Sequence, residues 1–176
     1  LDEPVYRDAL SACDEAIRKE SGFSIIEELD KPESTSRIHE TMVAQPCLFA
    51  LEVSLAALLK SWGIVPSAVI GHSVGEIAAA HVAGILELAQ AARLVCIRAR
   101  VMQKATGHGK MVSVSLNEEA ARKAIGGFEE RIGIAAVNDP NSVVLSGEIE
   151  ALDEVISRLS ASGVQARALR VNYAFH

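Results

Sequence analysis

The sequence has few cysteines and few aromatic residues, and its basic residues do not outnumber its acidic ones. Aromatic residues make up 4% of the 176 positions and hydrophobic residues 49%, which favours α/β layering over an all-β sandwich. The three cysteines, Cys13, Cys47 and Cys96, are widely spaced. They predict neither a disulfide framework nor a metal site, and they are typical of buried residues in a reducing cytoplasm. The net charge of −6 argues against a nucleic-acid partner.

Long uninterrupted apolar runs are also absent. Charged residues or glycines break each apolar stretch, so we expect neither a membrane span nor a signal peptide. A chain of 176 residues can bury one sizeable core together with a smaller satellite domain. It opens within a helical pattern and closes at residues 173–176 without a terminal element. We interpret it as a fragment of a longer protein that lacks both ends.

A serine between two glycines is the most informative feature that is present. An apolar strand is predicted over residues 67–70 and an alanine-rich helix over 74–83, with Ser73 in the Gly-x-Ser-x-Gly turn between them. This order is typical of a nucleophile elbow, in which the serine hydroxyl is exposed at the start of a helix. The two glycines would let strand and helix approach closely. The N–H of Val74 would be the first donor of an oxyanion hole. The turn therefore predicts an acyl-transfer enzyme.

A second informative feature is an arginine on the apolar face of a helix predicted over residues 87–105. Arg98 shares this face with Leu88, Ala91, Val95, Met102 and Ala105. A guanidinium on an apolar stripe is costly unless an anion meets it. Two interpretations stay open: Arg98 binds an anionic ligand, or it lies at the edge of the core beside a structural carboxylate.

Helical patterns account for the rest of the N-terminal part. Helices are predicted over residues 4–20, 23–29 and 37–62, the last of them restarting at Pro46, a residue suited to a first helical turn. This helix carries Leu48, Leu51, Leu55, Leu58 and Leu59 on one stripe.

The period of the pattern changes after residue 107, where strands and helices follow in βαββαβ order. This is the order of a ferredoxin-like unit. The fold class is therefore α/β, with a large subdomain over residues 1–106, a small ferredoxin-like subdomain over 107–171 and a return to the large subdomain at 172–176. The predicted strands are 111–116, 132–137, 142–146 and 164–171, and the predicted helices are 117–125 and 148–162.

A serine nucleophile needs a base, and histidine is the usual one. The side chain of His72 should point away from that of Ser73 across the turn, which favours a supporting role. His176 follows an apolar run where the chain leaves the small subdomain, so it is the best placed base. The remaining candidates are His39, His81 and His108.

Several motifs together resemble one known family. They are Gly-His-Ser-Val-Gly-Glu, the segment Cys-Ile-Arg-Ala-Arg-Val-Met-Gln around Arg98, the Ala-Ala-Val-Asn turn and the closing Tyr-Ala-Phe-His. The chain resembles the acyltransferase domains of type I modular polyketide synthases and the related malonyl-CoA:acyl carrier protein transacylases over essentially its whole length. The resemblance implies an α/β-hydrolase-like core with an inserted ferredoxin-like subdomain.

The resemblance also implies a reaction and its residues. A malonyl-type extender unit would pass from CoA to Ser73, and then to the phosphopantetheine thiol of an acyl carrier protein. His176 would be the base, and Arg98 would bind the free carboxylate of the acyl group. No bound cofactor or metal is expected. The expected partners are malonyl-CoA, an acyl carrier protein and neighbouring synthase domains such as a ketosynthase, in the cytoplasm.

Further residues are implied near the substrate. His72, Phe175 and Gln45 are expected there, and Gln45 lies in the family's Gln-Pro segment. The family's glycine-glutamine-glycine loop, which supplies a second oxyanion donor, is absent, and we do not equate Gln45 with its glutamine. Phe175 and Val74 are similar to malonyl-selective domains and Tyr173 to methylmalonyl-selective ones, so malonyl is favoured.

Alternatives stay open. A serine esterase would share the turn but would need an acidic residue to orient its histidine, and Asp139 and Asp153 are available. A non-catalytic scaffold fragment is a second alternative, and a methylmalonyl-selective acyltransferase is a third. Basic residues that could dock an acidic carrier protein are Arg93, Arg100, Lys104, Arg167 and Arg170.

Overall fold

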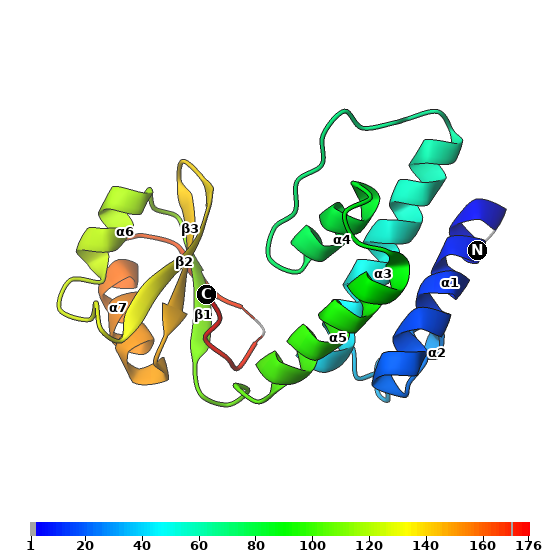
Figure 1. Ribbon diagram of the computed structural model, residues 1–176. Coiled ribbons are helices and arrows are strands. Elements are labelled where there is room, and N and C mark those ends of the chain that lie inside the picture. Colours follow the sequence, from blue (N-terminus) through cyan, green and yellow to red (C-terminus); the bar gives the residue numbers. More distant parts are fainter. Residues whose placement is uncertain (1–2, 170) are drawn as a thin grey trace. The chain divides into compact units, whose positions relative to one another are not determined.

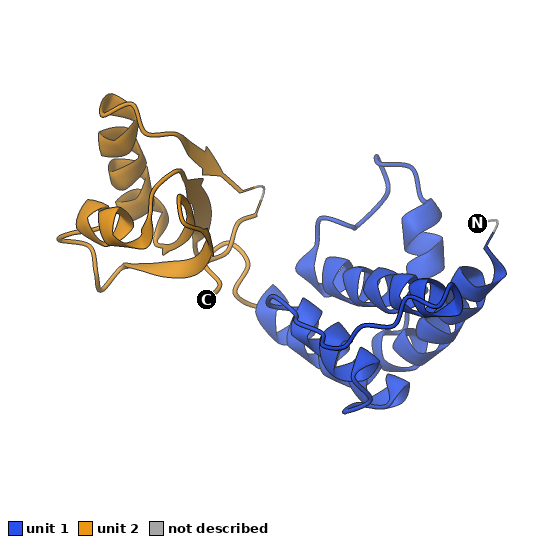
Figure 2. Ribbon diagram, turned by 90° about the horizontal axis from the view of Figure 1, so that it is seen from above, with its two compact units in different colours: residues 1–103 blue, residues 104–176 orange. Residues whose placement is uncertain are grey.

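The computed structural model describes residues 3–169 and 171–176 (Figure 1). The chain divides into two units, Leu1–Gln103 and Lys104–His176 (Figure 2). The described residues of the first unit are helical or irregular, whereas the second unit contains a sheet and helices.

Long helices lie side by side at the centre of the first unit (Figure 1). They are α1 (Pro4–Ser21), α3 (Thr41–Ser61) and α5 (Leu88–Gln103), and each contacts the other two. The shorter helices α2 (Ile25–Asp30) and α4 (Gly75–Val82) pack against them. α3 is long and apolar enough to cross a membrane, but half of its most apolar window is buried inside the unit, as in a core helix.

Helix α3 differs from the prediction at Pro46, where the helix was expected to restart. The helix begins at Thr41 and continues through Pro46 without a restart. Proline has no amide hydrogen, so this position cannot donate a hydrogen bond to the carbonyl of Met42. Packing of the buried face against α1 and α5 outweighs that loss.

The leucine stripe of α3 is not the buried face of the helix. Leu48, Leu55 and Leu59 are 46%, 50% and 40% exposed. The core-facing positions are instead occupied by residues such as Cys47 and Ala50, which are almost fully buried. α3 is apolar on both faces, so periodicity alone could not select the buried one.

The strand predicted over residues 67–70 is not formed. These residues have no regular secondary structure, and Ile70 is 97% exposed. A strand requires a hydrogen-bonded neighbour, and the described residues of the first unit provide none. The helix that follows, α4, is formed over Gly75–Val82, one residue shorter at each end than predicted.

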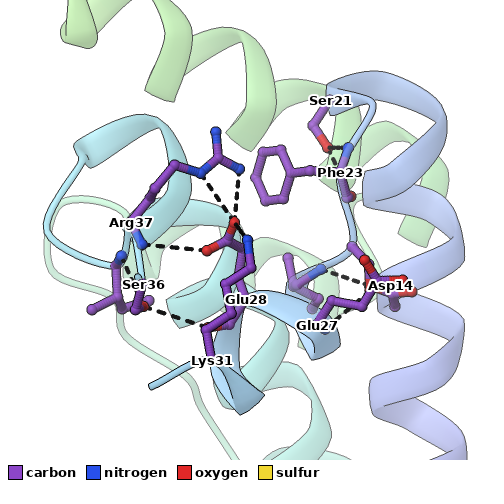
Figure 3. Close-up of polar contacts among 11 residues, drawn as sticks. Asp14, Ser21, Phe23, Glu27, Glu28, Lys31, Ser36 and Arg37 are labelled. Carbon is purple, nitrogen blue, oxygen red and sulfur yellow. Dashed lines mark hydrogen bonds and ion pairs between the residues drawn. The ribbon is translucent and has the colours of Figure 1, made fainter. Parts of the chain in front are cut away.

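Two buried carboxylates tie α2 to its neighbours (Figure 3). The Oδ1 atom of Asp14 accepts hydrogen bonds from the N–H of Ile25 at 2.7 Å and from the hydroxyl of Ser24 at 2.8 Å. The side chain of Glu28 is only 2% exposed, and its Oε1 atom accepts from Lys31 at 2.6 Å and from Arg37 at 2.8 Å. These contacts join α1, α2 and the segment that leads into α3.

A four-stranded antiparallel sheet forms the second unit, with strand order β2-β3-β1-β4. The helices α6 and α7 pack against the sheet, and Leu145 and Leu152 are fully buried in the core between them. This arrangement confirms the predicted ferredoxin-like unit. Its elements are β1 (Lys110–Val114), α6 (Glu118–Ala124), β2 (Ile132–Asp139), β3 (Ser142–Gly147), α7 (Ile149–Ala161) and β4 (Ala166–Ala168).

The end of the chain packs on the start of the same unit. The N–H of Gly107 donates to the carbonyl of Asn172 at 2.6 Å. A Cβ atom at Gly109 would lie 2.4 Å from that of Ala174, so only glycine permits this approach. β4 is shorter than the predicted strand 164–171, of which residue 170 lies outside the described residues.

Candidate active site

Ser73 lies in a strained turn directly before α4. Its φ angle is 55°, in the left-handed region that L-residues other than glycine rarely adopt. The carbonyls of His72 and Ser73 accept the first hydrogen bonds of the turn, from the N–H groups of Gly75 at 3.0 Å and Glu76 at 3.3 Å. Strain of this kind is typical of a nucleophile elbow.

The two glycines of the turn differ in how close their neighbouring atoms lie. A Cβ atom at Gly71 would lie 2.3 Å from backbone atoms of Gly75 and Glu76, so the closeness predicted for this position is confirmed. A Cβ atom at Gly75 would lie 3.5 Å from Oε1 of Glu52, an ordinary contact distance. The steric role predicted for Gly75 was therefore wrong.

Arg98 is the centre of the polar contacts around Ser73. Its Nη2 atom donates a hydrogen bond to Oγ of Ser73 at 2.9 Å, and its Nη1 atom donates to Oε1 of Gln45. The side chain is half-buried, and burial lowers the pKa of its guanidinium, an effect opposed by the carboxylate of Glu76. No carboxylate of residues 3–169 or 171–176 forms an ion pair with Arg98. Its amide and hydroxyl partners argue against the interpretation as a structural ion pair.

Val74 lies at the N-cap of α4, with φ and ψ of −63° and −30°. Among the described residues, no acceptor is found for its N–H. The first N–H groups of a helix lack intrahelical partners and favour nearby negative charge. The backbone around Val74 therefore suits the oxyanion donor predicted from the sequence.

Ser73 and His72 line a pocket of about 820 Å³ in the first unit. Most of its other walls are apolar and come from α3, α4 and the segment between them. Glu52 also lines the pocket, and burial raises the pKa of its carboxyl. His72 is exposed at this pocket.

The five histidines occupy different surroundings. The Nδ1 atom of His81 lies 2.9 Å from the carbonyl oxygen of Leu86, and its ring contacts Phe49, which indicates a structural role. His39 and His108 are exposed. His176 belongs to the second unit, with a φ angle of 64°. Its pairing with Ser73 stays a prediction.

The acidic residues considered for an esterase have structural partners. Asp139 accepts a hydrogen bond from the N–H of Asn141 at 2.7 Å in the turn after β2. Asp153 pairs with Lys110. Neither contact involves a histidine.

The cysteines are buried, as predicted. Burial raises the pKa of the Cys13 and Cys96 thiols to about 11 and that of Cys47 to about 12. Such thiols stay protonated near neutral pH and are poor nucleophiles. Within the described residues, no cluster of three histidine, cysteine or acidic side chains could hold a metal ion.

Sequence reasoning missed two residues around Gln45. Its Nε2 atom donates to Oγ1 of Thr41 at 2.7 Å and to Sδ of Met102 at 3.4 Å. The spacing of four residues between Thr41 and Gln45 could have indicated a contact along one helix. No local pattern could have indicated Met102, which lies 57 residues from Gln45.

The fold of the chain is that of acyltransferases. The acyltransferase domain from module 8 of the salinomycin polyketide synthase matches 98% of the chain with a TM-score of 0.93 and 40% identity. The malonyl-CoA:ACP transacylase of Synechocystis sp. PCC 6803 matches the whole chain with a TM-score of 0.82 and 28% identity. The predicted fold class is confirmed by these similarities.

The amino-acid sequence identifies the family to which the chain belongs within this class of acyltransferases. The model of the acyl transferase domain matches residues 1–176, and the chain belongs to this family, in the group found in type I polyketide synthases. Erythronolide synthase EryA3 of Saccharopolyspora erythraea is 45% identical over the whole chain.

The chain spans only part of the length of each of these relatives. It covers 6% of the length of erythronolide synthase EryA3, 41% of the salinomycin synthase structure and 57% of the Synechocystis structure.

Proposed function

We propose that this domain transfers a malonyl-type extender unit from CoA to an acyl carrier protein through an acyl ester on Ser73. The observation that carries the proposal is the half-buried guanidinium of Arg98, which donates to the serine oxygen at 2.9 Å and to an amide oxygen. A cation beside a nucleophile suits an acyl group that ends in a carboxylate.

In the first half-reaction, His176 takes the proton of the Ser73 hydroxyl while Oγ attacks the thioester carbonyl carbon of malonyl-CoA. The carbonyl oxygen becomes an oxyanion, which accepts a hydrogen bond from the N–H of Val74. The C–S bond then breaks, and the CoA sulfur leaves with the proton from His176. The product is a malonyl ester of Ser73.

The second half-reaction reverses these roles. His176 takes the proton of the phosphopantetheine thiol, and the sulfur attacks the ester carbonyl. The C–O bond to Ser73 breaks, and its Oγ regains the proton. Water must be kept from the ester, because hydrolysis would release free malonate.

Arg98 selects the acyl group in this proposal. A planar guanidinium matches a carboxylate with two parallel N–H···O bonds. Arg98 uses one N–H for Gln45 and one for Ser73, and guanidinium has five. The remaining groups, together with the one released from Ser73 on acylation, bind the malonyl carboxylate.

The substrate preference and the partners belong to the same proposal. The rings of Phe175 and Tyr173 stack with centroids 3.7 Å apart, and Phe175 fills the space that an α-methyl group needs. The domain uses no bound cofactor and works beside a ketosynthase in the cytoplasm. The two units correspond to the large and small subdomains of the family.

Carrier docking uses exposed basic residues of either unit. Arg93, Lys104 and Arg167 are exposed. Arg100 instead donates to the carbonyl of Glu20 at 3.1 Å and joins α5 to the end of α1. Arg170 lies outside the described residues.

The test replaces Arg98 by alanine in the intact protein and compares loading from malonyl-CoA and acetyl-CoA. We expect malonyl loading to fall about 100-fold, because two charge-assisted hydrogen bonds are lost, and acetyl loading to persist. Arg93→Ala, on the exposed face of the same helix, is the control and should change neither. Equal loading of malonate by Arg98→Ala and wild type would contradict the proposal and favour an esterase, which needs no carboxylate site.

A further inference from the structure

The side-chain amide of Gln45 is held by contacts on both of its ends. Gln45 is 5% exposed, and its Nε2 atom donates to Oγ1 of Thr41 at 2.7 Å and to Sδ of Met102 at 3.4 Å. A thioether sulfur accepts hydrogen bonds but cannot donate them. The NH₂ half of the amide therefore faces Thr41 and Met102.

This orientation directs the amide oxygen at Arg98. The Oε1 atom of Gln45 accepts a hydrogen bond from Nη1 of Arg98. A guanidinium has donors only. If the amide were reversed, its NH₂ group would face the donors at Nη1, and its oxygen would face the thioether of Met102, with only the Thr41 hydroxyl able to donate to it. Met102 and Arg98 thus select the orientation of the amide, and the Thr41 hydroxyl anchors the amide in it.

We propose that Thr41 and Met102 are positioning residues that hold Arg98 ready for the carboxylate of the acyl group, through the fixed amide of Gln45. The proposal rests on the proposed function of Arg98. Thr41 is the first residue of α3 and is 6% exposed, so water competes little for its hydroxyl. Met102 lies near the end of α5, one turn beyond Arg98.

A backbone contact secures the same end of the helix pair. The N–H of Met42 donates to Oε1 of Gln103 at 3.2 Å. It joins the first turn of α3 to the last residue of α5 and keeps Thr41 beside Met102. The guanidinium, held at Nη1 by Gln45, presents Nη2 to Oγ of Ser73 at 2.9 Å. Release of the amide would let the guanidinium rotate away from Ser73.

The experiment measures steady-state transfer from malonyl-CoA or acetyl-CoA, by the intact protein, to the phosphopantetheine thiol of an acyl carrier protein over a range of CoA-ester concentrations. Thr41→Val removes the hydroxyl and keeps the shape of the side chain, and Met102→Leu removes the sulfur acceptor. We expect each to raise the KM for malonyl-CoA about five- to tenfold with little change in kcat, because one neutral hydrogen bond is lost from a binding interaction. The KM for acetyl-CoA, which has no carboxylate, should stay unchanged.

Two control variants separate positioning from folding. Thr41→Ser restores the hydroxyl and should return the KM for malonyl-CoA to the wild-type value. Ser54→Ala removes another buried hydroxyl from α3, one that donates to the carbonyl of Ala50 at 2.6 Å and has no contact with Gln45. It should leave both KM values unchanged.

The outcomes distinguish this proposal from the proposed function. If wild-type protein loads malonate in a manner that depends on Arg98, but Thr41→Val and Met102→Leu leave its KM unchanged, the positioning role is wrong and the proposed function stands. Equal losses for malonyl-CoA and acetyl-CoA also overturn it, because they indicate a structural role. A wild-type protein that loads no acyl group overturns both proposals.

Discussion

Ser73 combines an unfavourable backbone with favourable surroundings for its side chain. A residue other than glycine with φ of 55° costs about 1–3 kcal/mol, and this cost must be met by the packing of the turn against α4. In return, the hydroxyl lies at a helix N-terminus and within 2.9 Å of the guanidinium of Arg98. Both stabilise negative charge as it develops on oxygen atoms at the site.

The choice between extender units is tested at Phe175. Phe175→Ser removes the ring and opens space for an α-methyl group, so we expect the ratio of methylmalonyl to malonyl loading to rise about tenfold, in line with the value of one methyl group in an apolar pocket. Competition between the two CoA esters, read by intact-protein mass, measures the ratio. Phe175→Leu keeps much of the bulk and should stay malonyl-selective. An unchanged ratio for Phe175→Ser would exclude Phe175 as the selective residue.

Sequence reasoning went furthest for Ser73 and Arg98. The glycine pattern predicted the turn, and helical spacing placed Arg98 on the buried side of its helix, where the structure finds it bonded to the serine. The orientation of the Gln45 amide could not be predicted, since it depends on Met102, 57 residues away. Contacts of this kind are set by packing between helices, which leaves no local signal.

Among the elements, the turn before α4 depends on Gly71. Gly71→Ala places a methyl group 2.3 Å from the backbone of Gly75 and Glu76. The turn must open, so we expect a loss of about 1–3 kcal/mol in the free energy of unfolding and loss of acyl loading. Chemical denaturation and mass spectrometry measure the two effects. Gly75→Ala, with an ordinary contact distance, is the control and should be nearly neutral in stability. Normal loading by Gly71→Ala would show that the tight turn is not needed.

The contacts of Glu28 in the short helix α2 predict that the stability of the fold depends on pH. The hydrogen bonds from Lys31 and Arg37 lower the pKa of the Glu28 carboxyl from 4.5 to about 2. A carboxyl with a lowered pKa in the folded state stabilises the fold above its unfolded pKa, and the stabilisation is lost as the pH falls through the folded pKa. The contribution of Glu28 should therefore be complete above about pH 5 and decline towards about pH 2.

Thermal unfolding of Glu28→Gln tests this expectation. Its Tm should lie below that of wild type near neutral pH, and the difference should shrink as the pH approaches 2. Glu119→Gln is the control, because Glu119 is 80% exposed and pairs with Lys123 only at the surface. A difference in Tm that is independent of pH would show that the charge of Glu28 is not what stabilises the fold.

The elements were predicted unevenly, for reasons that differ from one element to the next. The second unit has alternating strands and amphipathic helices, so its βαββαβ order was visible in the sequence and is confirmed. The prediction of a strand over residues 67–70 was wrong, because strand pairing depends on a neighbouring strand and not on local composition. Periodicity could not show which face of α3 is buried, because that helix is apolar all round.

For the whole molecule, the fold class was predicted from the order of its elements and from the motif resemblance, and structural similarity confirms it. The second unit has its own core around Val112, Val143 and Leu145. Ser73 and His176 belong to different units, so their pairing depends on how the units assemble. No local pattern determines that, and the proton transfer between them stays a prediction.

The central claim is that Ser73 accepts a malonyl group, and the most direct measurement is the mass of the intact protein after brief exposure to malonyl-CoA. Parallel samples receive methylmalonyl-CoA and acetyl-CoA, and Ser73→Ala is treated identically. We predict a malonyl adduct on the wild type that is absent from Ser73→Ala. No adduct from any donor on correctly folded protein would contradict the account and leave a hydrolase or an inert scaffold.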